Sequence, residues 1–339
     1  MQLDYPFTQL PIAFDAARLA EEALAIEEAA WMPHPQGFAG NSMLPLIAIN
    51  GDPANEEFEG PMRPTPHLAR LPYLRQAMAE IGAVAGRTRL MRLDGDAEVK
   101  RHADLGYYWF ERVRVHVPIT TQPSVRFECG DADVNMAPGE VWIFDTWRRH
   151  RVTNPKGDRR IHLVMDSVGG PAFWDLVKAG RPIGAGAAPR EDWSARVIAF
   201  DAEAQPQIPM ENRNVPAVMT PWELGSYLAF AAEEMGEHPL APQAQAIFDR
   251  FLKDWRALWA HYGEALEGRE TYMRRYAMFL QQLQPIATRI PLANEAPLFH
   301  MIRSALTLAI VAPPGGRAVQ RTAFSKQNPQ PMGQGAPAG

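Results

Sequence analysis

The stretch HADLGYYWFERVRVH, residues 102–116, places two pairs of polar side chains among aromatic and β-branched residues. His102 and Asp104 are two residues apart, and so are Arg114 and His116. Side chains two residues apart in an extended strand lie on the same face. The stretch therefore predicts two polar pairs that each share one face, an arrangement suited to holding a metal ion or an anion.

The composition is that of an ordinary globular protein. Its 339 residues suffice for one large domain or two ordinary ones, and 46% are hydrophobic and 22% charged. The net charge of -5 and the lack of a basic, aromatic stripe argue against nucleic-acid binding. The single cysteine, Cys129, excludes an internal disulfide framework and a thiolate zinc site, and it fits a reducing compartment.

The sequence shows no sign of a membrane or secretory segment. Its first residues lack a basic start followed by an unbroken apolar run, and no stretch has 18 consecutive apolar residues. We therefore expect a cytoplasmic protein without a membrane partner. Its oligomeric state is unknown from the sequence.

Period-two alternation dominates the middle of the chain and indicates short strands. Gly-containing turns such as DGD at 94–96 and APGE at 137–140 separate several of them. Since no helical pattern intervenes, an antiparallel sandwich or barrel is favoured over a doubly wound sheet. The strand-like runs are 88–93, 112–119, 124–129, 140–146 and 160–168.

Helical patterns lie on both sides of this β-region, so the predicted class is α+β. They cover 12–30, 67–84, 247–262, 271–283 and 298–311. The predicted organisation is an N-terminal helical or irregular support at 1–86, a β-core at 87–189, a helical region at 190–312 and a disordered tail at 313–339.

A metal site is the sharpest chemical hypothesis. His102 and Asp104 share a face, and His150 at the end of EVWIFDTWRRH is a candidate third ligand. Two imidazoles and one carboxylate form the facial triad of non-haem Fe(II) oxygenases, which leaves positions open for substrate and O2. Alone, a His-x-Asp pair is more often surface charge than a ligand pair.

Two strands also carry arginine and histidine on one face. Arg114 and His116 alternate with valines, and Arg160 and His162 alternate with Ile161 and its apolar neighbours. Such faces either meet solvent, as one side of an antiparallel sheet can, or enclose an anion that compensates the buried cations. Two such strands beside His102 and Asp104 favour an enclosed dianionic keto acid.

The ordered set HAD, RVRVHVPI, MAPGEVWIFDTWRRH and RRIHLVMD resembles the aspartyl/asparaginyl β-hydroxylase family of Fe(II)/2-oxoglutarate dioxygenases, which includes proline-hydroxylase-like members. The resemblance spans roughly residues 87–168. It implies a double-stranded β-helix core of the jelly-roll, cupin-like kind, with His102, Asp104 and His150 as iron ligands. It further implies that Arg160 binds the distal carboxylate of 2-oxoglutarate and that Arg114 and His116 help to hold this cosubstrate.

The expected activity is hydroxylation of an unactivated C–H bond of an amino acid, free or within a peptide, with Fe(II), 2-oxoglutarate and O2. Two alternatives remain open. One is a cupin-type metal-dependent isomerase or hydrolase that does not use 2-oxoglutarate, and the other is a non-enzymatic binding module. The arginines count against the first, and the intact triad counts against the second.

Overall fold

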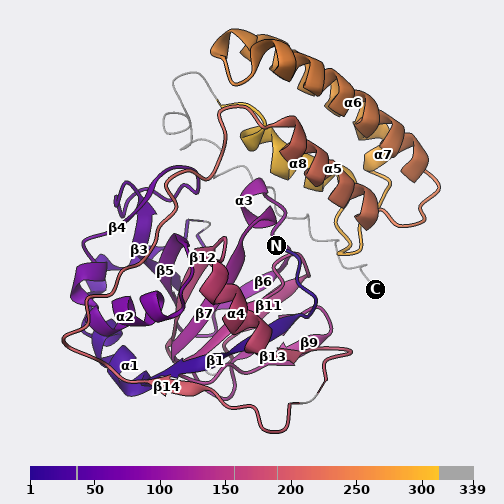
Figure 1. Cartoon of the computed structure of the whole chain (residues 1–339). Helices are drawn as coiled ribbons and strands as arrows, with labels where there is room; N and C mark the ends of the chain where they lie inside the picture. The colour runs from indigo at the N-terminus through magenta and orange to yellow at the C-terminus, as the bar shows by residue number, and fades with distance from the viewer. Residues whose placement is uncertain (36, 156, 189, 313–339) are drawn as a thin grey trace.

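The protein is described here by a computed structural model, in which residues 1–35, 37–155, 157–188 and 190–312 are placed. The expected disordered tail, 313–339, lies outside the described residues. Figure 1 shows a β-rich unit below and a group of four helices above it, with the short helix α3 (Tyr107–Phe110) near their junction.

Eight strands between residues 85 and 167 form a jelly roll. They run β5 (Ala85–Leu93), β6 (Glu98–His102), β7 (Val113–Thr120), β8 (Arg126–Cys129), β9 (Ala132–Val134), β10 (Glu140–Phe144), β11 (His150–Thr153) and β12 (Arg160–Ser167). The small sheet has the order β6-β11-β8-β9, and the large sheet contains the run β10-β7-β12-β5. Because the chain crosses repeatedly between two antiparallel sheets, the predicted double-stranded β-helix core is confirmed.

The large sheet extends beyond the jelly roll at both edges. β1 (Phe7–Phe14) pairs with β10, and β3 (Asn41–Ile49) pairs with β5. Four short strands complete it: β2 (Met32–Pro33), β4 (Met62–Pro64), β13 (Arg181–Ile183) and β14 (Arg196–Ile198). Long extra strands on both edges leave the four jelly-roll strands of the large sheet in its interior.

The two faces of the large sheet have opposite character. Its outer face carries Val113, Val115, Val117 and Leu163, which pack in one apolar core with helices α1 (Ala16–Leu24), α2 (Pro72–Glu80) and α4 (Pro171–Ala179). Its inner face meets the small sheet. That interior is apolar around Phe127 and Phe144 and polar where the arginines and histidines lie.

The four C-terminal helices form a second core. They are α5 (Pro221–Glu234), α6 (Ala241–Tyr262), α7 (Arg269–Ala287) and α8 (Leu298–Ala309), and the 3-10 turns η1 (Glu28–Ala30), η2 (Leu68–Arg70) and η3 (Leu266–Gly268) complete the helical elements. This core also includes Tyr107 and Trp147 of the β-unit, so the two units pack together. Among the described helices, none has both the length and the apolar character to cross a membrane.

Two sequence-based expectations about the flanking regions need correction. Residues 12–30 were predicted as one helix, but β1 continues to Phe14 and Asp15 caps α1 by accepting hydrogen bonds from the amides of Ala17 and Arg18. Residues 12–14 have helical propensity, but they are held extended because they pair with the neighbouring strands of the large sheet. The 190–312 region likewise becomes helical only from Pro221, because its first part runs along the β-unit, where β14 pairs with β1 and Ile198 is buried.

Gly139 occupies the turn into β10, and we predict that Gly139→Ala destabilises the fold. Its φ is +82°, and an added Cβ would lie 2.2 Å from the carbonyl oxygen of Phe14. The matched control is Gly95→Ala, with a φ of +64° and open space around the added atom. The control should cost only the left-handed backbone strain, about 1–2 kcal/mol, and Gly139→Ala should cost more. Equal losses in urea unfolding would contradict this account.

Candidate metal centre

The jelly roll brings the three candidate ligands together at one end of the small sheet. His102 ends β6, His150 begins β11, and the two are cross-strand partners with ring centroids 4.3 Å apart. Asp104 follows β6, and its backbone amide donates a hydrogen bond to the carbonyl of Thr146. One ligand atom from each of the three lies within 4.8 Å of the others.

Hydrogen bonds fix which nitrogen of each histidine faces this point. His102 Nδ1 lies 2.7 Å from the carbonyl oxygen of Lys100, and His150 Nδ1 lies 2.9 Å from that of Arg148. A carbonyl oxygen only accepts, so each Nδ1 carries the proton and each Nε2 presents a lone pair. The Nε2 atoms lie 3.7 Å and 4.0 Å from the carboxylate oxygens of Asp104. Such backbone anchoring is typical of metal-binding histidines.

The electrostatics favour the ligand forms of these side chains. Burial, together with the neighbouring His102, lowers the pKa of His150 to about 3, so its ring is neutral near pH 7. Burial opposes ionisation of Asp104, but Arg114, the two histidines and the N-terminus together outweigh it and hold the pKa of the carboxyl below its ordinary value. His150 Nε2 is buried without a hydrogen bond from any described residue, and buried Asp104 Oδ2 has an ion pair with Arg114 but no hydrogen bond within the described part of the chain. A buried lone pair and a buried carboxylate that face the same point fit a divalent cation.

Arg114 on β7 lies between two carboxylates. Its Nη1 is 3.3 Å from Asp104 Oδ2, and its Nε is 3.2 Å from Asp166 Oδ1 on the neighbouring β12. Its guanidinium also stacks 4.1 Å above the ring of Trp109. In this position Arg114 orients the candidate ligand Asp104.

Arg160, His162 and His116 form a second polar cluster, deeper between the sheets. Arg160 Nη2 lies 2.9 Å from His162 Nδ1, and that atom lies 3.4 Å from His116 Nδ1. All three are buried, with Arg160 only 3% exposed, so the alternative of a solvent-facing polar surface is wrong. Burial lowers the pKa of Arg160 to about 9, and no carboxylate among the described residues pairs with it.

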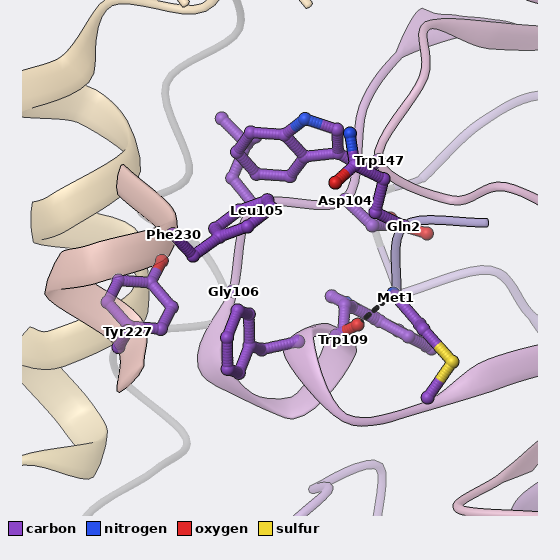
Figure 2. Close-up of a pocket in the computed structure, with 10 residues that line it drawn as sticks. Met1, Gln2, Asp104, Leu105, Gly106, Trp109, Trp147, Tyr227 and Phe230 are labelled. Carbon is purple, nitrogen blue, oxygen red and sulfur yellow. Dashed lines mark hydrogen bonds between the residues drawn. The ribbon is translucent and has the colours of Figure 1, made fainter. Parts of the chain in front are cut away.

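Sequence reasoning missed two arginines on the same inner face. Arg87 and Arg89 lie on β5, and Asp166 on β12 is 3.7 Å from Arg87 as well as next to Arg114. The signal was present, because arginines alternate in GRTRLMRL just as they do in RVRVH. Figure 2 shows the pocket beside Asp104, with Trp109 on the β-unit and Tyr227 and Phe230 on α5 around it.

That pocket, of about 190 Å³, lies between the jelly roll and the helical unit. The helices also hold the loop that leads to His150. Trp147 Nε1 donates to Glu234 on α5, and the Asn294 side-chain amide donates to the carbonyl of Trp147. The helical unit thus borders the metal centre and fixes one of its loops.

We predict that the metal-free protein loses stability as pH falls from 6.5 to 5.5, and that His162→Gln loses less. Burial and the charge of Arg160 keep the pKa of His162 well below its ordinary value. Below the unfolded-state pKa near 6.5, the unfolded chain therefore binds a proton at this histidine that the folded chain does not bind. The stabilisation is fully present above that pH. As the pH drops below 6.5, the free energy of unfolding decreases by about 1.4 kcal/mol per pH unit for each such histidine.

Urea unfolding at both pH values checks this slope. His261→Gln, which removes an exposed ring on α6, is the control and should keep the wild-type slope. An unchanged slope in His162→Gln would mean that the buried ring is not held neutral.

The comparisons agree with the sequence motifs. Residues 54–169 match the family model described as aspartyl/asparaginyl beta-hydroxylase, which confirms the resemblance. The matched region contains the three candidate ligands together with Arg114, His116 and Arg160. No curated protein matches the sequence.

Several solved structures are similar to part of the chain. A Pseudomonas putida prolyl-4-hydroxylase has 15% identity and a TM-score of 0.33, covering 48% of this chain and 93% of its own. HygX from Streptomyces hygroscopicus, with nickel and 2-oxoglutarate bound, has 14% identity and a TM-score of 0.35, covering 50% and 84%. A Trichoplax adhaerens prolyl hydroxylase bound to a peptide fragment has 12% identity and a TM-score of 0.35, covering 48% and 84%.

Proposed function

We propose that the protein is an Fe(II)/2-oxoglutarate-dependent dioxygenase that hydroxylates an unactivated C–H bond of an amino acid, free or within a peptide. The observation that carries the proposal is the pairing of two features between the same two sheets. One is a His-Asp-His cluster in which His150 Nε2 receives no hydrogen bond from the described residues, and the other is the buried guanidinium of Arg160, for which those residues offer no carboxylate partner.

His102, Asp104 and His150 would hold the iron. When bound, Fe(II) with 2-oxoglutarate supplies the activation of O2 and the oxidation of the C–H bond, while 2-oxoglutarate becomes succinate and CO2. Three protein ligands on one side of an ion leave positions open for a chelating keto acid and for O2. The backbone bonds to both Nδ1 atoms and the ion pair from Arg114 orient the three ligands before the metal arrives.

Arg160 would bind the distal carboxylate of 2-oxoglutarate. A guanidinium can clamp a carboxylate with two parallel hydrogen bonds, and burial strengthens that attraction. His116 lies on β7 beside His162 and is placed to line the same slot. Arg114 has its own carboxylate partners, so we assign it to positioning Asp104 and propose that it acts on the cosubstrate only through that ligand.

An anaerobic titration of the metal-free protein with Fe(II) and 2-oxoglutarate tests the proposal. We expect the visible charge-transfer band of the chelate to saturate at one equivalent. Iron binding without a band would instead favour the cupin-type isomerase or hydrolase. Failure to bind iron would favour the binding module.

A further inference from the structure

Arg89 is a second buried arginine for which the described residues provide no carboxylate partner. It is only 8% exposed and lies on β5, opposite Val164 of β12 and Pro45 of β3. Within the described part of the chain, its side chain makes one polar contact, 3.5 Å from Nη1 to the sulfur of Met43. A thioether is a weak acceptor and does not compensate a buried cation.

Its neighbours are paired, which sets Arg89 apart. On the same strand, Arg92 binds the carboxylates of Glu28 and Asp94, and Arg87 lies beside Asp166 and stacks 3.8 Å from the ring of Phe58. Arg112 on the segment before β7 binds Glu211 through two nitrogens. The unpaired state of Arg89 is therefore a local feature and does not extend to arginines in this sheet generally.

Arg89 faces the side of the sheet that carries the metal centre. Val164 is the register partner of both Arg89 and His116, so these two side chains lie on the same inner face with one strand between them. The next pair along that face is Asp166 and Arg114, and Arg114 reaches Asp104. Arg89 thus shares its chamber with the metal site and lies apart from Arg160, whose register partner is Leu93.

The charges of this chamber do not balance, even with the proposed ligands present. Among the residues that the structure describes, Arg87, Arg89, Arg114 and Arg160 are the cations of this chamber, and Asp104 and Asp166 are the carboxylates that face them. Adding Fe(II) and the dianion 2-oxoglutarate leaves this excess unchanged. Glu56 is a partly buried carboxylate near Arg87 and Arg89, and the net charge of the chamber stays positive when it is included.

We propose that Arg89 binds a carboxylate of the molecule that is hydroxylated, so the substrates of this protein are carboxylic acids. The inference rests on the proposed function and names its substrate class. Arg89 would hold the acid group beside the metal centre, while Arg160 holds the cosubstrate.

The test uses the full chain loaded with Zn(II) and saturated with 2-oxoglutarate. In this form the protein can bind ligands but cannot turn them over. The probes are propionate and its neutral isostere propionamide, followed by ligand-observed NMR. Propionate should bind saturably, and propionamide should bind at least tenfold more weakly. Arg89→Leu should weaken propionate binding at least tenfold, Arg89→Lys should retain part of it, and Arg126→Leu, at an exposed arginine on β8, should leave it unchanged.

Two further readouts separate this inference from the proposed function. Arg89→Leu should keep the Fe(II)/2-oxoglutarate band, and the metal-free variant should unfold at the wild-type temperature or above, because an unpaired buried charge has been removed. Loss of the band in Arg89→Leu, equal binding of the two probes, or no saturable propionate binding to the wild type would overturn the inference. Absence of the band in the wild type would instead overturn the proposed function. If Arg160→Leu abolished propionate binding and Arg89→Leu did not, the carboxylate would be bound by Arg160 and the assignment of Arg89 would be wrong.

Discussion

Asp104→Ala should abolish turnover and strongly weaken Fe(II) binding. The loss of affinity should exceed the roughly 10–100-fold that is typical when a residue that hydrogen-bonds to a metal ligand is removed. The substitution removes the single anionic donor of the cluster, a carboxylate that Arg114 and the other nearby positive groups keep ionised. Arg114 retains Asp166 as a partner at 3.2 Å, so the variant is not left with an unpaired buried arginine there. Equilibrium dialysis with Fe(II) and the charge-transfer titration measure the two effects.

The matched control for this variant is Asp133→Ala, which removes an exposed carboxylate paired with Arg126 on the small sheet. It should bind iron as the wild type does. If Asp104→Ala also bound one equivalent of Fe(II) at wild-type affinity, the site would be a two-histidine centre and Asp104 would serve only to pair with Arg114.

The β-core could be predicted because its long strands alternate in one consistent way. The runs at 112–119 and 160–168 became β7 and β12, with valines and leucines on the helix-covered face. β6, β9 and β11 were not singled out. β9 has three residues, and the sequence of β6, EVKRH, is largely exposed, so neither carries enough apolar alternation to indicate a strand.

The support region at 1–86 shows why a strand without alternation escapes prediction. β1 reads FTQLPIAF and is buried on both faces, so it has almost no alternation, and it borders a segment rich in helix formers. Its conformation is decided by pairing with β10 and β13, which are distant in the sequence. Local propensity cannot reveal a choice that tertiary contacts make.

Some residues of the candidate site could likewise be predicted from the sequence, and others could not. His102, Asp104, His150 and Arg160 could be proposed from the sequence, since strand ends position ligands whose spacing is visible. Arg89 could not, because its significance lies in the carboxylate that no described neighbour supplies. The role of Arg114 likewise depends on Asp166, which is 52 residues away and enters its environment only through the register of β7 and β12.

The helical unit fixes the loop before His150 and lines the pocket beside Asp104. Asn294 and Glu234 hold Trp147, three residues before His150, while Tyr227 and Phe230 wall the pocket beside Asp104. The loop between β10 and β11 is therefore fixed from both sides, by the jelly roll and by the helices. A separate helical module would not need these contacts, so we infer that the two units work as one site.

Arg160→Leu should raise the 2-oxoglutarate concentration needed for half-saturation of the charge-transfer band by about 10- to 150-fold. A charge-assisted hydrogen-bonded pair contributes about 1.5–3 kcal/mol, and each 1.4 kcal/mol is a factor of ten in affinity. In the metal-free protein Arg160 is buried with no carboxylate partner among the described residues, so its replacement by leucine should not lower the free energy of unfolding.

Arg159→Leu is the neighbouring control. Arg159 is 47% exposed in its side chain and pairs with Asp94 at the surface, so this variant should bind 2-oxoglutarate as the wild type does. Unchanged cosubstrate affinity in Arg160→Leu would show that the distal carboxylate lies elsewhere. Arg89, which has no carboxylate partner among the described residues, would then be the next candidate to receive it, and the assignments of the two arginines would have to be exchanged.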